Sequence, residues 1–394
     1  MYLLYIFQHF NPNFNMNVFF SIILSSLLFM NCTSSMQHAE LSQIEWENGS
    51  SLPGDNTGHS HKGLAGPIVG VSNGILIVAG GANFPDKMPW EGGVKWYHDR
   101  VYAYKINDGN IKLFKVSLLP ATVAYTANYS ANNTVYAVGG EDIKGATSTA
   151  MTYKWNTDRN ELESSFLPNL PLPLTNGSLV VYDDKLYFIG GENANLVSNK
   201  IYVLDLQALA NGWIEFLDLP LPLTHTVALI NNDKLYLFGG RKRNEGAVST
   251  LYNQSYRIDL VEKNVVGIAA LPHGIAAGTG FVDYKGRMIL IGGDKGETFH
   301  RVEKLILAIH KEPDPLKKDS LNNEKADVQS AHPGFTKDVW QYGEEDNKWY
   351  SLSPLPEGSP VTTTAVMFQD RVFIPSGEIK AGVRTSNILV GNIN

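Results

Sequence analysis

Two side chains near the C-terminus are of types that could carry out acid–base chemistry on an acidic ligand. In the stretch PSGEIKAGVRTSN, the carboxylate of Glu378 and the guanidinium of Arg384 lie six residues apart. A carboxylate can act as a base, and an arginine fork can bind a ligand carboxylate through two parallel hydrogen bonds. The same two residues could instead form an ion pair across a hairpin, worth under about 1 kcal/mol if exposed. The elements that hold them decide between the two interpretations.

A repeated pattern of short strands and glycine pairs predicts those elements. β-rich runs end in a glycine pair at five places, namely Gly81, Gly140, Gly191, Gly240 and Gly293. A sixth run, VFIPSG, ends at Gly377 with Ser376 in place of the first glycine. Four strand-like segments per unit and units of about fifty residues are typical of the blades of a β-propeller, here of the kelch type. We therefore predict an all-β fold, a six-bladed kelch-type β-propeller.

The two ends of the repeat region predict how the ring of blades closes. The last unit supplies only three strands, at about 362–390, whereas IEWENGSSLP near the N-terminus resembles an isolated fourth strand. Pairing them would close the last blade with an N-terminal strand and remove a free sheet edge. The fifth unit is longer than the others, so we expect an insertion at about 295–336 in blade five, with a short helix at 301–309. The propeller is assigned to residues 36–394.

The first 35 residues are expected to be a targeting segment and not part of the fold. MNVFFSIILSSLLFMNC is an apolar run that ends in a small polar cluster, as export signals do. Cys32 lies where the acylated cysteine of a lipoprotein would be. We thus predict that residues 1–35 are an export signal or a lipoprotein leader. The protein is expected to be exported, to the periplasm, and to contact a membrane only through a lipid on Cys32.

Composition argues against several classes of function. The net charge of -7 does not favour nucleic-acid binding, which needs clustered Lys and Arg. Cys32 is the only cysteine, so an intrachain disulfide, a thiolate zinc site and a cysteine-linked radical cofactor are excluded. His98, His273 and His300 do not have metal-ligand spacing. We expect neither a metal nor a cofactor.

The loops that follow the glycine pairs are expected to surround the channel on one face. Aligning them places six residues at equivalent positions, namely Ala82, Glu141, Glu192, Arg241, Asp294 and Glu378. Tyr125, Asn176 and His225 lie fourteen residues before the first glycine of their units and should mark the mouth end of the inner strands. This polar face of mixed charge suits a small polar ligand. The candidate substrate-binding residues are Arg241, His225, Asn83 and Asn176.

The stretch GEIKAGVRT resembles the catalytic loop of the N-acetylneuraminate epimerase family, bacterial sialic acid mutarotases built on a six-bladed kelch propeller. The chain order, with GGANFPDKMPWEGGVKWYHDRVY in the first blade and this loop in the last, resembles the cyclically permuted branch of that family. The resemblance implies that Glu378 transfers protons and that Arg384 binds the carboxylate of the substrate. It implies an isomerase that interconverts the α and β anomers of N-acetylneuraminic acid by acid/base ring opening and closure at C2. Ser376 and the long insertion depart from the family pattern.

The implied reaction needs both a base and an acid. A neighbouring cation should lower the pKa of Glu378 and make it a weak acid, so we expect a separate proton donor, with His225 as the first candidate. Asn83 could contact the N-acetyl group, and Arg241 could extend the carboxylate or glycerol-chain site. The alternative is an exported, non-catalytic carbohydrate-binding or scaffold propeller, in which Glu378 and Arg384 are merely paired.

Overall fold

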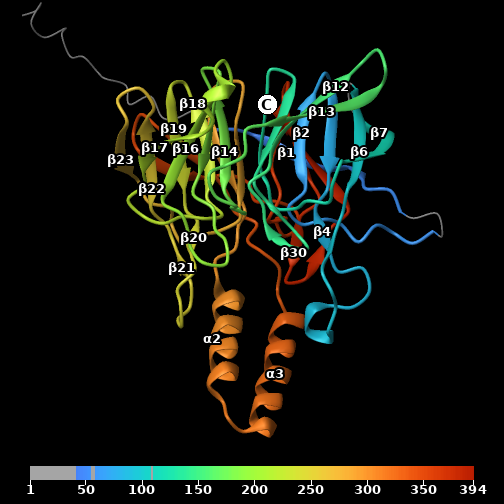
Figure 1. Cartoon of the computed structure of the whole chain (residues 1–394), viewed down its shortest axis with the longest axis vertical. Coiled ribbons are helices and arrows are strands. Elements are labelled where there is room, and N and C mark those ends of the chain that lie inside the picture. The colour runs from blue at the N-terminus through green and yellow to red at the C-terminus, as the bar shows by residue number, and fades with distance from the viewer. Residues whose placement is uncertain (1–40, 55–57, 108–109) are drawn as a thin grey trace, which may run out of the picture. The chain divides into compact units, whose positions relative to one another are not determined.

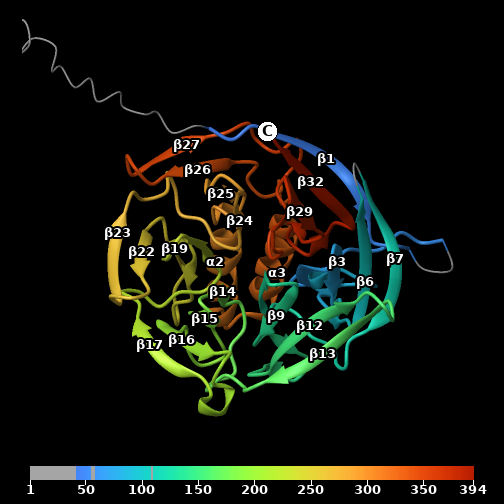
Figure 2. The ribbon, with the colours of Figure 1, turned by 90° about the horizontal axis from the view of Figure 1, so that it is seen from above.

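Six antiparallel sheets of four strands surround a central channel (Figure 1, Figure 2). The computed structural model describes residues 41–54, 58–107 and 110–394. The six-bladed all-β propeller predicted from the glycine pairs is confirmed. The predicted leader, with Cys32, lies outside the described residues. No helix in the described part of the chain is long and apolar enough to cross a membrane.

Each blade runs from an inner strand beside the channel to an outer strand at the rim. Blade one contains β2 (Ile68–Ser72), β3 (Ile75–Ala79), β6 (Arg100–Asn107) and β7 (Asn110–Leu118), and blade two contains β8 (Ala127–Ala131), β9 (Thr134–Val138), β12 (Ala150–Asn156) and β13 (Glu161–Leu167). Blade three contains β14 (Ser178–Tyr182), β15 (Lys185–Ile189), β16 (Lys200–Asp205) and β17 (Ile214–Asp218), and blade four contains β18 (Val227–Asn231), β19 (Lys234–Phe238), β22 (Ser255–Asp259) and β23 (Asn264–Ile268). Blade five contains β24 (Thr279–Val282), β25 (Met288–Ile291), β26 (Val339–Gly343) and β27 (Lys348–Ser351), and blade six contains β28 (Val366–Phe368), β29 (Arg371–Pro375), β32 (Asn387–Ile393) and β1 (Ile44–Ser51). A short 3-10 helix, η2 (Leu209–Asn211), precedes β17.

The last blade is closed by the N-terminal strand, as the sequence predicted. β1 pairs with β32 in antiparallel register from Ile44 opposite Ile393 to Ser51 opposite Asn387. The same strand therefore supplies the outer edge of blade six and ties the start of the propeller to its end. Figure 2 shows β1 and β32 side by side at the rim, between blades one and five.

The core consists of six apolar clusters, each shared by two adjacent blades. Strands such as β3, with the sequence ILIVA, are buried along their whole length because a neighbouring blade covers each face. β-branched and aromatic side chains suit such surfaces. Trp155 is the largest of the fully buried side chains and packs between blades one and two.

A closed ring of backbone hydrogen bonds joins the inner strands at their mouth ends. One residue from each blade takes part, in the order Gly66, Tyr125, Asn176, His225, Ala277 and Thr362. Each N–H donates to the carbonyl of the preceding blade's residue at 2.7–3.2 Å, and Gly66 closes the ring by donating to Thr362. All six have φ between 53° and 61°, a left-handed conformation that costs energy for every residue except glycine. We call these six residues the backbone ring.

Two helices are inserted between β25 and β26, where the sequence indicated one short helix. They are α2 (Glu297–Lys311) and α3 (Pro315–Ser330). Figure 1 shows that the pair projects from the face that carries β4 and β30, and Figure 2 shows it behind the centre of the ring. Ser249 of blade four donates to both carboxylate oxygens of Glu303 on α2, at 2.6 and 2.8 Å. α3 contacts the short 3-10 helix η1 (Pro89–Glu91) of blade one. The helices therefore connect the loops of blades four and one across the mouth.

Candidate active site

The six residues that follow the glycine pairs occupy equivalent positions at the mouth of the channel. Each forms an antiparallel β-bridge with the residue before a member of the backbone ring. They are Ala82, Glu141, Glu192, Arg241, Asp294 and Glu378, and we call them the mouth residues. Four of them begin short hairpins, formed by β4 (Ala82–Asn83) with β5 (Trp96–Tyr97), β10 (Glu141–Asp142) with β11 (Gly145–Ala146), β20 (Arg241–Lys242) with β21 (Thr250–Leu251), and β30 (Glu378–Lys380) with β31 (Val383–Arg384).

Ser376 shows how the last blade departs from the glycine pattern. The first glycine of each pair has positive φ and little room, and a Cβ at Gly190 would collide with the carbonyl oxygen of Leu223. Ser376 has φ 57° and is fully buried. Its hydroxyl accepts the Leu64 N–H at 2.7 Å and donates to the Thr385 carbonyl at 2.6 Å. The hydroxyl thus ties the start of blade one to the loop that contains Arg384.

Replacing Ser376 with alanine is expected to lower the free energy of unfolding by about 1–3 kcal/mol, because two buried backbone groups lose their partner. Denaturant unfolding of Ser376→Ala and of the exposed control Ser351→Ala would measure the difference. Equal stability of the two variants would show that the hydroxyl bonds contribute nothing.

The β30–β31 hairpin places Glu378 directly opposite Arg384. Oε1 of Glu378 accepts the Gly382 N–H at 2.8 Å, and Oε2 lies 3.5 Å from Nη2 of Arg384. The turn at Gly382 packs against Pro89 and Trp90 of η1. The spacing of six residues is therefore the span of a tight hairpin that holds a carboxylate and a guanidinium side by side at the mouth.

Arg384 is held in place by its neighbours, but one of its hydrogen-bond donors has no partner in the described part of the chain. It is only 9% exposed, its guanidinium carbon lies 4.8 Å from the centroid of the Phe84 ring, and Nη1 donates to the Gly382 carbonyl. Its Nε is buried and has no hydrogen-bond partner among the described residues. A buried donor without a partner is costly, and a ligand carboxylate would supply the missing acceptor.

The pKa of Glu378 differs from the expectation that its cation would lower it. Burial raises the pKa above its usual value, and it outweighs the opposing effects of the Arg384 charge, the Gly382 N–H and Lys95. The expectation was wrong because spacing reveals the neighbouring cation but not the loss of solvent. A carboxyl with a raised pKa is a stronger base than an ordinary carboxylate and can take a proton from a substrate hydroxyl more readily.

A second polar cluster lies in blades three and four. Nη2 of Arg241 lies 2.5 Å from Oε1 of Glu192, and Nε2 of His225 lies 3.7 Å from the same oxygen. Burial raises the pKa of Glu192, but the neighbouring His225 and Arg241 outweigh it and bring the pKa to about 2. Burial lowers the pKa of His225, so its imidazole is neutral near pH 7. A neutral imidazole is a poor proton donor, and we do not retain His225 in that role.

A third cluster joins blades one and two, and the sequence did not identify its members as site residues. Lys95 and Tyr97 both contact Oε1 of Glu141, at 3.2 and 2.7 Å. The ammonium of Lys95 also lies 5.1 Å from the centroid of the Tyr125 ring. The only available signal was the equivalent position of Glu141 after its glycine pair. Its partners, Lys95 and Tyr97, come from the long loop of blade one.

The sequence and the fold of the chain resemble those of known proteins. A sequence profile of N-acetylneuraminate epimerases matches residues 30–162 and 167–394. The chain belongs to the N-acetylneuraminate epimerase family. An N-acetylneuraminate epimerase of Pasteurella multocida (strain Pm70) is 36% identical over 119 residues, which are 27% of this chain and 31% of that protein. One from Yersinia pestis (strain Pestoides F) is 31% identical over 130 residues, 30% of this chain and 32% of that protein.

These alignments to individual epimerases span about a third of each relative's length. The solved structure of YjhT aligns over 84% of this chain and 97% of its own, with a TM-score of 0.61 and 13% sequence identity. At that identity the likeness bears on the fold alone. The sequence profile therefore establishes the family of this chain, and the structural comparison supports its propeller architecture.

In this epimerase-family chain, two of the residues predicted to bind the substrate make contacts with other parts of the protein. The amide of Asn83 is buried, donating to the Gly63 carbonyl at 2.8 Å and facing Nε2 of His98 at 2.9 Å. Asn176 belongs to the backbone ring and lines the channel. Substrate binding by Asn83, Asn176, His225 and Arg241 stays a prediction. No cluster of three or more His, Cys, Asp or Glu residues in the described chain could hold a metal ion.

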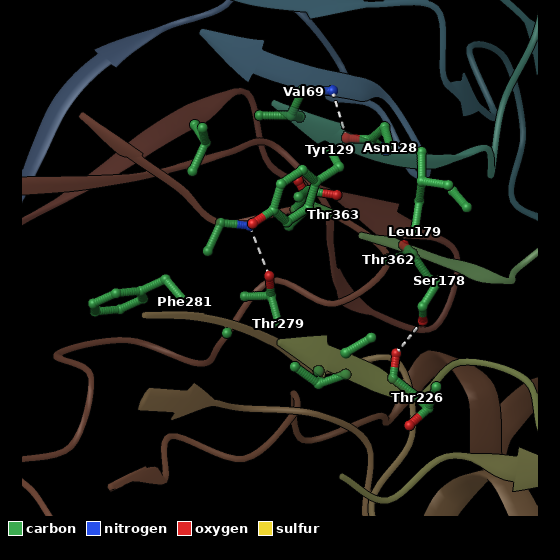
Figure 3. Close-up of a pocket in the computed structure, with 18 of the residues that line it drawn as sticks. Val69, Asn128, Tyr129, Ser178, Leu179, Thr226, Thr279, Phe281, Thr362 and Thr363 are labelled. Carbon is green, nitrogen blue, oxygen red and sulfur yellow. Dashed lines mark hydrogen bonds between the residues drawn. The ribbon is translucent and has the colours of Figure 1, made fainter. Parts of the chain in front are cut away.

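The channel on the other side of the backbone ring is a separate space. It forms a cavity of about 260 Å³ lined by the inner strands of all six blades, and neither Glu378 nor Arg384 reaches it. Figure 3 shows its polar side chains bonded to adjacent blades, as Ser178 donates to the Thr226 carbonyl at 2.7 Å. Thr279 likewise accepts the Ala365 N–H at 2.7 Å. The channel lining contains neither the carboxylate nor the guanidinium of the β30–β31 hairpin, so we locate the chemistry at the mouth and not in the channel.

Proposed function

We propose that this protein is a mutarotase that interconverts the α and β anomers of N-acetylneuraminic acid. The observation that carries the proposal is the β30–β31 hairpin, where a carboxyl of raised pKa adjoins a buried guanidinium with an unused donor. A sugar acid with a carboxylate next to its anomeric carbon matches that arrangement. The membership of the epimerase family supports the same substrate class.

The reaction can be assigned to groups at the mouth. Arg384 would bind the C1 carboxylate and keep C2 beside Glu378, which is the positioning part of catalysis. Glu378 would take the proton of the anomeric hydroxyl as the C2 bond to the ring oxygen breaks. Rotation of the resulting ketone and closure on its other face would give the opposite anomer. Each proton transfer by a placed group is worth roughly 10²–10⁴-fold in rate.

The proposal can be tested by time-resolved proton NMR of α-N-acetylneuraminate freshly released by a sialidase. The C3 protons of the two anomers report how fast the mixture approaches equilibrium. A mutarotase accelerates this approach above the buffer rate in proportion to enzyme concentration. A protein that binds the sugar but leaves the buffer rate unchanged is the non-catalytic carbohydrate-binding propeller instead.

The pH dependence of the rate should follow the ionisation of Glu378. Because the base must be ionised and burial raises its pKa, kcat/KM is expected to fall as pH decreases, with a midpoint above the usual carboxyl value of 4.5. Rates measured at closely spaced pH values, each corrected for the buffer reaction, would locate that midpoint. A rate that stays constant below pH 4.5 would contradict the assignment of Glu378 as the base.

A further inference from the structure

Asp294 is the mouth residue of blade five and the neighbour of Glu378 around the mouth. Asp294 bridges to Ala276, and Glu378 bridges to Val361. The next residues of these two inner strands are bonded directly, since the Thr362 N–H donates to the Ala277 carbonyl at 3.2 Å. Both residues are partly exposed, and the side chain of Glu378 is 18% exposed, so a ligand at the mouth can reach this part of the site. Two carboxyl groups therefore face one ligand site from adjacent blades.

The four acidic mouth residues differ in their ion pairs. Three of them have a cation within 4.0 Å, namely Glu141 with Lys95 at 3.2 Å, Glu192 with Arg241 at 2.5 Å, and Glu378 with Arg384 at 3.5 Å. Asp294 has no such pair within the described ranges, and its Oδ1 accepts only the Gly296 N–H, at 2.8 Å. A half-buried carboxyl without a cation favours its neutral form. Asp294 is thus the acidic mouth residue whose ionised form no ion pair within the described ranges stabilises.

The groups around Asp294 come from the start of α2, the end of α3, β20 and β30. Burial raises the pKa of Asp294, and the Gly296 N–H, His332, His300 and Arg241 act in the opposite direction. His332 follows α3, and burial lowers its pKa, which keeps it neutral near pH 7. Arg241 is engaged by Glu192. Glu378 lies close enough that the negative charge of Asp294 raises the pKa of Glu378. Two like charges at one site disfavour the state in which both carboxyls are ionised.

We propose that Asp294 is the acid that protonates the ring oxygen while Glu378 accepts the proton of the anomeric hydroxyl. The assignment rests on the proposed mutarotase function and supplies the donor that this function requires. It also gives a role to the insertion of blade five, because His300 on α2 and His332 just after α3 lie close enough to act electrostatically on Asp294.

The step balances without a metal or a co-reactant. Glu378 takes the hydroxyl proton at C2, and the C2 oxygen forms the carbonyl as the bond from C2 to the ring oxygen breaks. The ring oxygen keeps that electron pair and takes the proton of Asp294. After rotation about the bond from C2 to C3, the new hydroxyl attacks the other face of C2. Its proton returns to Asp294, and Glu378 returns its proton to the carbonyl oxygen, so both carboxyls regain their starting states.

The two carboxyls should hold one proton between them across the working pH range. Arg384 at 3.5 Å favours the ionised form of Glu378, whereas Asp294 has no comparable cation. Below this range both are protonated and the base is lost, and above it both are ionised and the acid is lost. We therefore expect a bell-shaped dependence of kcat/KM on pH, with limits that belong to the coupled pair.

The test compares wild type with Asp294→Asn, which retains the acceptor for Gly296 but cannot give a proton. In the NMR assay we expect kcat to fall by about 10²-fold or more, with the Kd for N-acetylneuraminate changed by less than about 3-fold. The residual activity should lack the alkaline limit that wild type shows. The control Asp346→Asn changes the same residue type in blade five, in the turn between β26 and β27, away from the mouth.

The possible results separate the role of Asp294 as the acid from the mutarotase function itself. An active wild type with an equally active Asp294→Asn would overturn the role of Asp294 and leave the mutarotase proposal standing. An inactive wild type would overturn both. If Asp294→Asn fails to fold, as judged by its thermal unfolding, the wild-type pH profile still decides, because the absence of an alkaline limit would rule out Asp294 as the acid.

Discussion

Replacing Glu378 with glutamine is expected to slow mutarotation by about 10²–10⁴-fold while leaving ligand affinity nearly unchanged. The amide can still accept the Gly382 N–H that Oε1 accepts at 2.8 Å, so the hairpin should keep its shape. What is lost is the ability to take the proton from the anomeric hydroxyl. Time-resolved NMR would measure the rate, and calorimetric titration with N-acetylneuraminate would measure the affinity.

Glu345→Gln is a matched control for this variant. Glu345 is exposed in the turn between β26 and β27, where the same substitution should leave the rate unchanged. If Glu378→Gln were as active as Glu345→Gln, the Glu378–Arg384 pair would be an ion pair without a catalytic role.

Replacing Arg384 with alanine is expected to weaken substrate binding by about 2–5 kcal/mol, or at least roughly 30-fold. The variant loses the donors for the substrate carboxylate and leaves Glu378 without the cation that lies 3.5 Å away. KM and Kd should rise together, and kcat should also fall because C2 is no longer held beside the base. Arg384→Lys keeps the charge but not the planar fork, so an intermediate loss is expected.

The methyl ester of N-acetylneuraminic acid separates carboxylate recognition from general destabilisation. Wild type should bind the acid far better than the ester, and Arg384→Ala should bind both equally weakly. Arg159→Ala, in an exposed turn of blade two, controls for the loss of a surface arginine. Equal binding of acid and ester by wild type would show that Arg384 does not recognise the carboxylate.

The architecture could be predicted because its signals are local and repeated. Glycine pairs mark positions where a positive φ or a close backbone contact is required, and the strands between them are apolar on both faces. The closing strand β1 was predictable because one unit lacked its fourth strand. The opposition of Glu378 and Arg384 was also predictable, since a short segment between two strands must return as a hairpin.

Other features depend on contacts between distant residues or on solvent exposure. The pairing of Lys95 with Glu141 and of Glu192 with His225 joins different blades, and no spacing within one unit encodes it. The raised pKa of Glu378 depends on burial by the assembled mouth. The helix α3 was missed because its sequence is mostly polar and has no clear apolar stripe, although its start was marked by Asp314, which caps the helix, and by Pro315 in the first turn.

The most direct test of the central claim is saturation-transfer NMR on an equilibrium mixture of the two anomers with catalytic amounts of protein. Saturating the C3 proton signal of one anomer reports how fast it converts to the other, without any need to prepare a pure anomer. Wild type should give strong transfer, and Glu378→Gln should give transfer at the buffer rate. Transfer at the buffer rate with wild type, under conditions where the sugar binds, would contradict catalysis by Glu378.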